Sequence, residues 1–312
     1  MSGRRTSGNV DDRRGIRGGG SGKLIGGGIV GVIAVVIMTL LSGGGIGDIF
    51  TNLASSGQLS GLTQNTSYTE NYQPDAEDER LAEFASQVLA GTEDVWTAEF
   101  RRQGWGEYEC PKMVLFSGAV SSGCGSATSQ SGPFYCSADK TVYIDLDFFK
   151  QMKQQIGADG DFAYAYVIAH EVGHHVQQQL GILGDAHQKM SRMSEKEANK
   201  ISVRLELQAD FLAGVWANLD NKMFNSLEPG DIENAIDAAS KIGDDYLQKK
   251  AYGREIPDSF NHGRSEQRVK WLSKGIQTGD VSLGDTFAPA YEALEKKLKL
   301  RGNSKKMRIF AL

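Results

Sequence analysis

The chain has 312 residues, of which 40% are hydrophobic and 23% are charged, and its net charge at pH 7 is −5. This length allows one large or two medium domains, and the composition is that of an ordinary globular protein. A nucleic-acid-binding protein would carry a basic surplus, so the charge argues against that class and we expect no nucleic-acid partner.

The amino-terminal region differs from the rest of the chain. Residues 1–23 contain six basic side chains, and residues 24–47 contain no charge. The apolar centre, 24–41, is 18 residues long, close to the about 20 residues that cross a bilayer as a helix. A secretory signal peptide is the alternative, but its apolar part is shorter, about 7–15 residues, and is followed by a cleavage pattern that 42–45 lacks. The sequence therefore predicts an uncleaved transmembrane anchor.

The basic flank precedes the apolar segment, which indicates a cytoplasmic tail at 1–23 and a body on the other side of the membrane. Cys124 and Cys136 lie in a segment rich in serine and glycine, and such a pair can form a disulfide outside the cytoplasm. Cys110 is the odd cysteine, and no histidine or basic context marks it as a nucleophile. We expect a single-pass membrane protein whose body is periplasmic or extracellular.

Residues 42–75 are rich in small and polar residues and are expected to form a flexible linker. Apolar residues then recur at helical spacing over 75–104, which predicts two short helices split at Gly91. Strands are expected at 112–120 and 140–149. The second segment alternates apolar and polar residues, as a strand with two different faces does.

Four helical segments follow. The first is expected at 162–180, the second at 194–219 with Ser194 and Glu197 as a capping box, the third at 232–250, and a shorter one after His262. The predicted fold class is therefore α+β, mostly helical with a small β-sheet before the first of these helices. We place the folded domain at 76–290 and a basic tail at 291–312.

The first of these helices contains VIAHEVGHHV at 167–176, which holds three of the five histidines of the chain. Residues four apart lie on one face of a helix, so His170 and His174 can direct two imidazoles at one zinc ion. Glu171 lies one position further round, which suits a general base acting on zinc-activated water. A pair of core histidines without a metal is the alternative, but the apolar surroundings offer these imidazoles no evident partner.

A catalytic zinc ion has three protein ligands, so a third must come from elsewhere. The metzincin pattern fails, because it needs a histidine where this chain has Leu180. Glu206 and Asp210 lie four apart within an apolar run, where two carboxylates need partners. We predict that Glu206 binds zinc and that Asp210 accepts the ring N–H of a ligand histidine. The alternatives are His187 as the ligand, or an ion pair of these carboxylates with Arg204.

Two downstream residues complete the candidate site, in SFNHGRSEQRVKWL at 259–272. His262 is a candidate for a hydrogen bond to the oxyanion of a tetrahedral intermediate, and Arg268 for orienting a carboxylate of the site. The alternative for both is a surface loop followed by the start of a helix. His175 points off the face of the two ligands and is expected to be structural.

Three segments together resemble the bacterial family of predicted neutral zinc metallopeptidases (YpfJ-type): VIAHEVGHHVQ, RLELQADFLAGVWA and NHGRSEQRVKWL. GPFYC, KTVYIDLDFF and GDVSLGDTF also match, and the resemblance covers about residues 75–288 together with the basic amino terminus and its anchor. It implies a zincin-like metallopeptidase domain with a gluzincin-like site. The roles that it implies are zinc binding by His170, His174 and Glu206, general base catalysis by Glu171, and support of a ligand by Asp210.

The segment from His262 to Arg268 is also similar to the H-P-x-x-x-x-R stretch of the membrane-linked zinc proteases that process prenylated proteins. The spacing is the same, and Gly263 replaces the proline, so the local turn is expected to differ. In gluzincin-like enzymes an edge strand before the motif helix binds the peptide as an added strand. The resemblance assigns that role to KTVYIDLDFF.

The leading hypothesis is a membrane-anchored zinc endopeptidase of the bacterial inner or plasma membrane, with peptides or proteins as substrates. An anchored scaffold that binds zinc only for structure is the alternative from another class, and a hydrolase of a different amide is a third. Glu171 argues against the scaffold, because a purely structural zinc site has no use for a base at that position.

Overall fold

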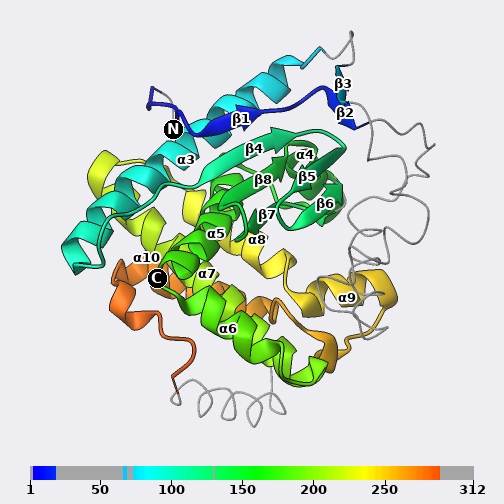
Figure 1. Ribbon diagram of the computed structural model, residues 1–312, viewed down its shortest axis with the longest axis vertical. Coiled ribbons are helices and arrows are strands. Elements are labelled where there is room, and N and C mark those ends of the chain that lie inside the picture. Colours follow the sequence, from blue (N-terminus) through cyan, green and yellow to red (C-terminus); the bar gives the residue numbers. More distant parts are fainter. Residues whose placement is uncertain (1–2, 19–65, 69–72, 129–130, 289–312) are drawn as a thin grey trace.

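Figure 1 shows the computed structural model of the chain, which describes residues 3–18, 66–68, 73–128 and 131–288. This part is mostly helical and has a small sheet before the motif helix, as predicted. The helices are α3 (Ala76–Gln103), α4 (Asp147–Gln151), α5 (Asp161–Gln179), α6 (Ile182–Met190), α7 (Glu195–Phe224), α8 (Asp231–Lys241), α9 (Asp244–Tyr252) and α10 (Ser265–Thr278), with single turns η2 (Met152–Ile156), η3 (Pro257–Ser259) and η4 (Val281–Leu283). The strands are β1 (Val10–Asp12), β2 (Ile16–Gly18), β3 (Thr66–Tyr68), β4 (Lys112–Phe116), β5 (Ala119–Ser122), β6 (Gly125–Thr128), β7 (Phe134–Cys136) and β8 (Thr141–Asp145).

The main sheet has the strand order β1-β4-β8-β7, in which β7 alone is antiparallel to its neighbour. All five residues of β8 are buried, because both faces of the sheet are covered. Val142 and Ile144 pack in the main core, whereas Tyr143 packs in a second cluster. β8 thus lies inside the sheet, so the expectation that KTVYIDLDFF forms a peptide-binding edge strand is wrong. The last three residues of that segment begin α4 instead.

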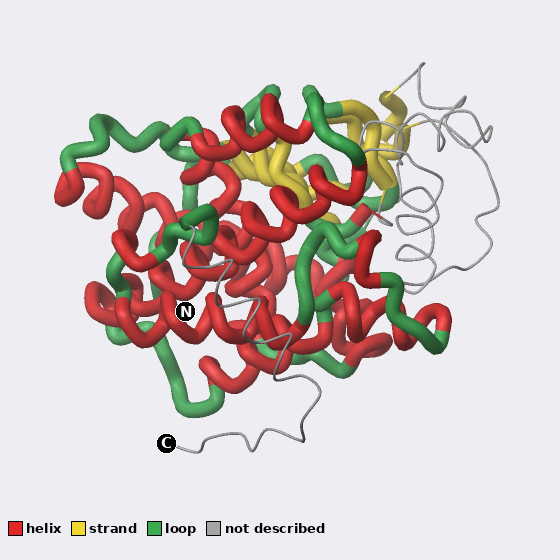
Figure 2. The backbone as a smooth tube through the Cα atoms, turned by 90° about the horizontal axis from the view of Figure 1, so that it is seen from below, coloured by secondary structure: helices red, strands yellow, loops and turns green. Residues whose placement is uncertain are grey.

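Glycines let the helices that carry the site approach closely. Figure 2 shows the strands gathered together with the helices packed against them, and α7 contacts both α5 and α10. A Cβ atom on Gly173 of α5 would lie 3.1 Å from the backbone oxygen of Ala209 in α7. A Cβ atom on Gly275 of α10 would lie only 2.2 Å from the oxygen of Phe211 in α7. Larger side chains at these positions would push the three helices apart.

Two helix boundaries differ from the prediction. The segment expected as two helices is the single helix α3, because Gly91 serves packing: a Cβ atom there would lie 2.8 Å from the carboxylate of Asp220. The helix expected at 232–250 is divided into α8 and α9 at Gly243, where a Cβ atom would lie 2.3 Å from the first backbone nitrogen of α10. α6 has no counterpart among the predicted elements, and Ser194 begins α7 without the predicted side-chain cap.

Residues 3–18 are part of the folded body. β1 adds a parallel strand to β4, and Arg4 forms an ion pair with Asp220 of α7. The sequence predicts a basic tail at 1–23; the described part of that segment, 3–18, packs on the domain, where its polar groups find their partners. The predicted anchor (24–41), most of the predicted linker and the tail (291–312) lie outside the described residues.

Among the helices that the structure describes, none combines the length and the apolar character needed to cross a membrane.

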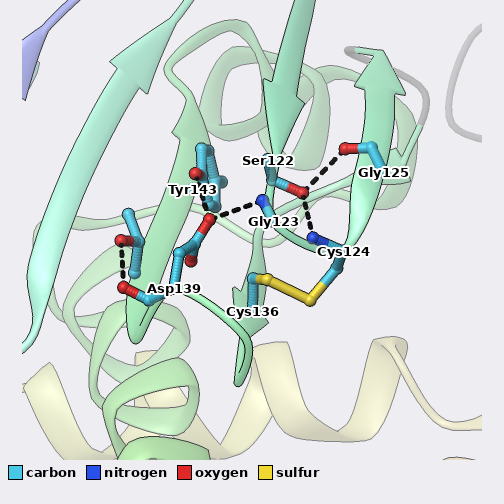
Figure 3. The surroundings of a disulfide bond; sticks show 8 residues. Ser122, Gly123, Cys124, Gly125, Cys136, Asp139 and Tyr143 are labelled. Atoms are coloured by element: carbon cyan, nitrogen blue, oxygen red, sulfur yellow. Dashed lines mark hydrogen bonds between the residues drawn. A yellow bond between two sulfur atoms is a disulfide. The ribbon is translucent and has the colours of Figure 1, made fainter.

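Cys124 and Cys136 are joined by a disulfide, the pairing that the sequence predicts. The bond ties the turn of the β5–β6 hairpin to β7, as Figure 3 shows. Asp139 holds the same corner, since its carboxylate accepts hydrogen bonds from the amide of Gly123 and the hydroxyl of Tyr143. The hairpin is thereby fixed to the edge of the main sheet.

Candidate active site

α5 presents His170 and His174 from consecutive turns, with ring centroids 4.9 Å apart. Glu206 of α7 lies opposite both rings: Oε2 is 3.1 Å from Nε2 of His170, and Oε1 is 3.4 Å from Nε2 of His174. One ligand atom of each residue lies within 4.8 Å of the other two. Within the described residues, this is the one group of histidine, cysteine and acidic side chains with the spacing of a metal site.

The far sides of the two rings decide which nitrogen atoms offer lone pairs to a metal. Nδ1 of His170 is 2.8 Å from a carboxylate oxygen of Asp210, and Nδ1 of His174 is 2.9 Å from the amide oxygen of Gln177. Both acceptors require an N–H at Nδ1, so Nε2 of each neutral ring carries a lone pair directed at Glu206. Such an arrangement needs a cation between the groups. Two imidazole nitrogens and a carboxylate oxygen are a donor set of catalytic zinc sites, so the residues fit zinc.

The pKa values express the same demand for positive charge. Burial by itself would lower the pKa of His170, but Asp210 and Glu206 outweigh burial and raise this pKa to about 10. Burial would likewise raise the pKa of Glu206, but the charge of His174 and the hydrogen bonds from both rings bring this pKa well below its ordinary value. The site therefore attracts a cation, whether a proton or a metal ion.

Asp210 is fully buried and holds His170 from behind. It accepts a hydrogen bond of 2.6 Å from the hydroxyl of Tyr166 and two from Arg268, at 2.9 and 3.0 Å. Burial would raise the pKa of Asp210, but the charges of Arg268 and His170 lower it, so the carboxylate stays ionised. Arg268 therefore orients a carboxylate, and its place behind Asp210 makes it a positioning residue rather than a catalytic one.

Glu171 lies on α5 next to His170 and is 9% exposed. Its carboxylate makes no hydrogen bond to the part of the chain that the structure describes. Burial raises the pKa of Glu171, and the charges of the two imidazoles only partly oppose this rise. A carboxylate with a raised pKa beside the ligand atoms is suited to accept a proton from water.

His262 lies in the loop before α10 and is fixed by Asp244 of α9. The Asp244 carboxylate accepts the backbone N–H groups of His262 and Gly263, each at 2.8 Å, and lies 3.2 Å from Nδ1 of the His262 ring. Gly263 has a φ of 100°, which accounts for glycine at this turn. Burial would lower the pKa of His262, but Asp244 and the charge of Glu206 raise it. The loop thus places the His262 ring close enough to Glu206 for the charges of the two groups to interact.

The profile of a family described as "Putative neutral zinc metallopeptidase" matches residues 1–287. The chain belongs to this family. The Escherichia coli (strain K12) protein YpfJ is 45% identical over 289 residues, which are 91% of this chain and 97% of YpfJ. The Mycobacterium tuberculosis (strain ATCC 25618 / H37Rv) protein Rv2575 is 47% identical over 193 residues, 59% of this chain and 64% of its own length. Both relatives are named as uncharacterized proteins, and no solved structure matches.

Three further candidates from the sequence lie apart from the group formed by His170, His174 and Glu206. His175 is fully buried, and its Nδ1 is 2.9 Å from the hydroxyl of Tyr135 on β7, so it joins α5 to the sheet. His187 lies on α6 and is not in the metal-binding group. Burial raises the pKa of the Cys110 thiol, which disfavours a nucleophilic thiolate.

Three residues that support the site have no place in the sequence prediction: Tyr166, Gln177 and Asp244. Helical spacing offers a signal for two of them, since Tyr166 lies four residues before His170 and Gln177 lies three after His174. Asp244 reaches His262 only through the packing of α9, and no local pattern in the sequence marks it.

Replacing Gln177 with leucine should weaken zinc binding about 10–100-fold, the usual cost of removing a partner behind a ligand histidine. Gln177 is fully buried, and its amide is fixed by hydrogen bonds to Leu205 and Gln208. The substitution leaves the Nδ1–H of His174 without an acceptor, so the ring loses its orientation. Competition with a chromogenic chelator measures the affinity. Gln178→Leu, at the neighbouring half-buried position, is the control, and equal losses in both variants would contradict this role of Gln177.

Proposed function

We propose that this protein is a zinc endopeptidase that hydrolyses peptide bonds in proteins, with Glu171 as the general base. The observation that supports this most is the combination of a three-residue ligand group within 4.8 Å and a buried carboxylate beside it. Burial disfavours the ionised form of Glu171 and raises its pKa, and a metal site used only for structure gains nothing from that cost. A hydrolytic site needs that carboxylate.

Zinc, when bound, polarises the scissile carbonyl group and lowers the pKa of water toward neutrality. Glu171 accepts the proton of the attacking water and passes it to the leaving amine. His262, whose pKa is raised, donates a hydrogen bond to the developing oxyanion. Asp210 and Arg268 hold Nδ1 of His170 as a donor, so that Nε2 keeps its lone pair for the metal.

We also propose that the protein is attached to a bacterial membrane through residues 24–41 and that its domain works on the outer side. The uncharged segment of 18 residues supports attachment, and the disulfide between Cys124 and Cys136 supports an oxidising compartment. Release of the protein from membranes by salt or carbonate alone would contradict the attachment.

Replacing Glu206 with alanine should abolish zinc binding at equimolar zinc, because the site loses its anionic ligand and keeps two neutral rings. Metal analysis after gel filtration measures the zinc content of each chain. Glu195→Ala, on the exposed first turn of the same helix, should keep one zinc ion and serves as the control. If the Glu206→Ala variant kept its full zinc content, Glu206 would not be a zinc ligand.

The direct test of the proposed function uses the full-length protein purified in detergent. We expect one zinc ion per chain and cleavage of an unfolded protein such as reduced casein. Treatment with 1,10-phenanthroline should stop the cleavage, and added zinc should restore it. Bound zinc with no cleavage of any unfolded protein would favour the structural scaffold instead.

A further inference from the structure

Residues 3–18, the amino-terminal strap, are bound to the domain at three successive points, beginning with Arg4. The Arg4 guanidinium forms two hydrogen bonds with Asp220 of α7, at 2.7 and 2.8 Å, and the Asp220 side chain is 1% exposed. The pair lies over Gly91 of α3, where a Cβ atom would come within 2.8 Å of Asp220 and 3.0 Å of Arg4. Gly91 thus makes room for the Arg4 side chain of the strap. Its partner Asp220 lies on α7, the helix that also carries Glu206.

The second point is Glu93 of α3, which is 6% exposed. Its carboxylate accepts hydrogen bonds from the hydroxyl of Ser7 and, at 2.8 Å, from the side-chain amide of Asn9. The backbone N–H of Ser7 donates to the backbone oxygen of Ser86 at 3.2 Å. Because this carboxylate is buried under the strap, the polar residues of the strap supply the partners that its burial requires.

The third point is the sheet and the first turn of α3. β1 pairs with β4 in a parallel register, and the backbone of Arg13 donates to the oxygen of Leu115 at 2.8 Å. Arg14 donates to the backbone oxygen of Asp78 at 2.9 Å and pairs with Glu79 at 3.1 Å, with its side chain only 6% exposed. The strap is therefore recognised by side chains and by backbone, as a strand of the domain is.

We propose that the strap is docked on its own domain in the full-length protein, so that the amino terminus and the active site lie on the same side of the membrane. A single crossing by residues 24–41 would put the strap and the domain on opposite sides. β2 pairs with β3 between Gly18 and Thr66, so the chain leaves and rejoins the described fold at neighbouring residues. The topology rests on the proposed membrane attachment, whereas the docking does not.

The basic residues that predict a cytoplasmic tail have a different use in this arrangement. Arg4, Arg5 and Arg14 each pair with a carboxylate on the domain. The match to the family profile covers residues 1–287, so the strap lies within the part of the chain that matches the family. These charges therefore stabilise the docked strap instead of indicating the side of the membrane.

Disulfide trapping tests the docking. In the full-length protein with Cys110→Ser, the pair Ser7→Cys and Ser86→Cys should form an intramolecular disulfide on mild oxidation in cells. The linked tryptic peptides are measured by mass spectrometry of the monomer band. We expect at least a tenfold higher yield than for Ser7→Cys with Ser191→Cys, because Ser191 is exposed at the end of α6. A yield no higher than this control would overturn the docking.

Thiol labelling tests the topology. Ser2→Cys and Ser191→Cys, each in the Cys110→Ser background, are exposed to a membrane-impermeant maleimide in spheroplasts and in inverted vesicles. We expect both cysteines to be modified in the same preparation, because a docked strap would place both on the side of the membrane that holds the domain. Modification of Ser2→Cys in one preparation and of Ser191→Cys in the other would overturn the shared side and restore a single crossing.

Discussion

The Glu171→Gln variant should keep its zinc and lose a factor of about 10²–10⁴ in peptidase rate, the range that general acid–base catalysis contributes. Glutamine preserves the size of the side chain and removes its basicity. Glu171 is 9% exposed and makes no hydrogen bond to the described part of the chain. A neutral amide is less costly to bury than a carboxylate, so the variant should be at least as stable as the parent protein.

The measurements for this variant are kcat/KM on casein peptides, zinc content and thermal unfolding. Glu197→Gln, on an exposed turn of α7, makes the same chemical change far from the base and should leave all three unchanged. Full activity of Glu171→Gln would remove Glu171 as the base. Loss of zinc would show instead that Glu171 holds the metal site together.

The ligand group could be predicted because helical periodicity fixes its geometry. Spacing of four residues places His170 beside His174, and the same spacing places Glu206 beside Asp210. The apolar residues around these pairs make isolated burial costly, so each pair needs the other. The structure brings the two pairs together, with Asp210 2.8 Å from Nδ1 of His170. Local pattern and the cost of burial were sufficient for this part of the site.

The contacts that depend on distant segments could not be predicted in this way. The alternation in β8 indicates a half-exposed strand, but Tyr143 is covered by a second cluster that includes Phe116 and Val120. A count of charged residues cannot predict the ion-pair partner of Arg4, because Asp220 lies 216 positions further along the chain. Asp244 fixes the His262 loop only because the predicted helix is divided at Gly243 into α8 and α9. In each case, the partner is set by packing between elements, which composition and periodicity do not record.

Replacing Arg268 with alanine should destabilise the fold by about 3–5 kcal/mol, the usual cost of removing one partner of a buried ion pair. Arg268 is 4% exposed and Asp210 is fully buried, so the carboxylate would keep only the weaker donors Tyr166 and His170. The effect should persist in the presence of a chelator, because it arises in the protein and not in the metal. Zinc affinity should also fall about 10–100-fold, since the support of His170 is loosened.

Chemical denaturation of the chelator-treated protein measures this effect at several pH values. Arg268 helps to keep the pKa of Asp210 below its ordinary value, so this stabilisation is present above the unfolded-state pKa of about 3.9 and is lost as the pH falls through the folded-state value. The difference between Arg268→Ala and the parent protein should therefore shrink in acid. Arg264→Ala is the control, because its ion pair with Glu255 is 40% and 25% exposed and should contribute about 1 kcal/mol or less. If both variants lost the same small amount, Arg268 would not be the residue that holds Asp210 ionised behind the metal ligand.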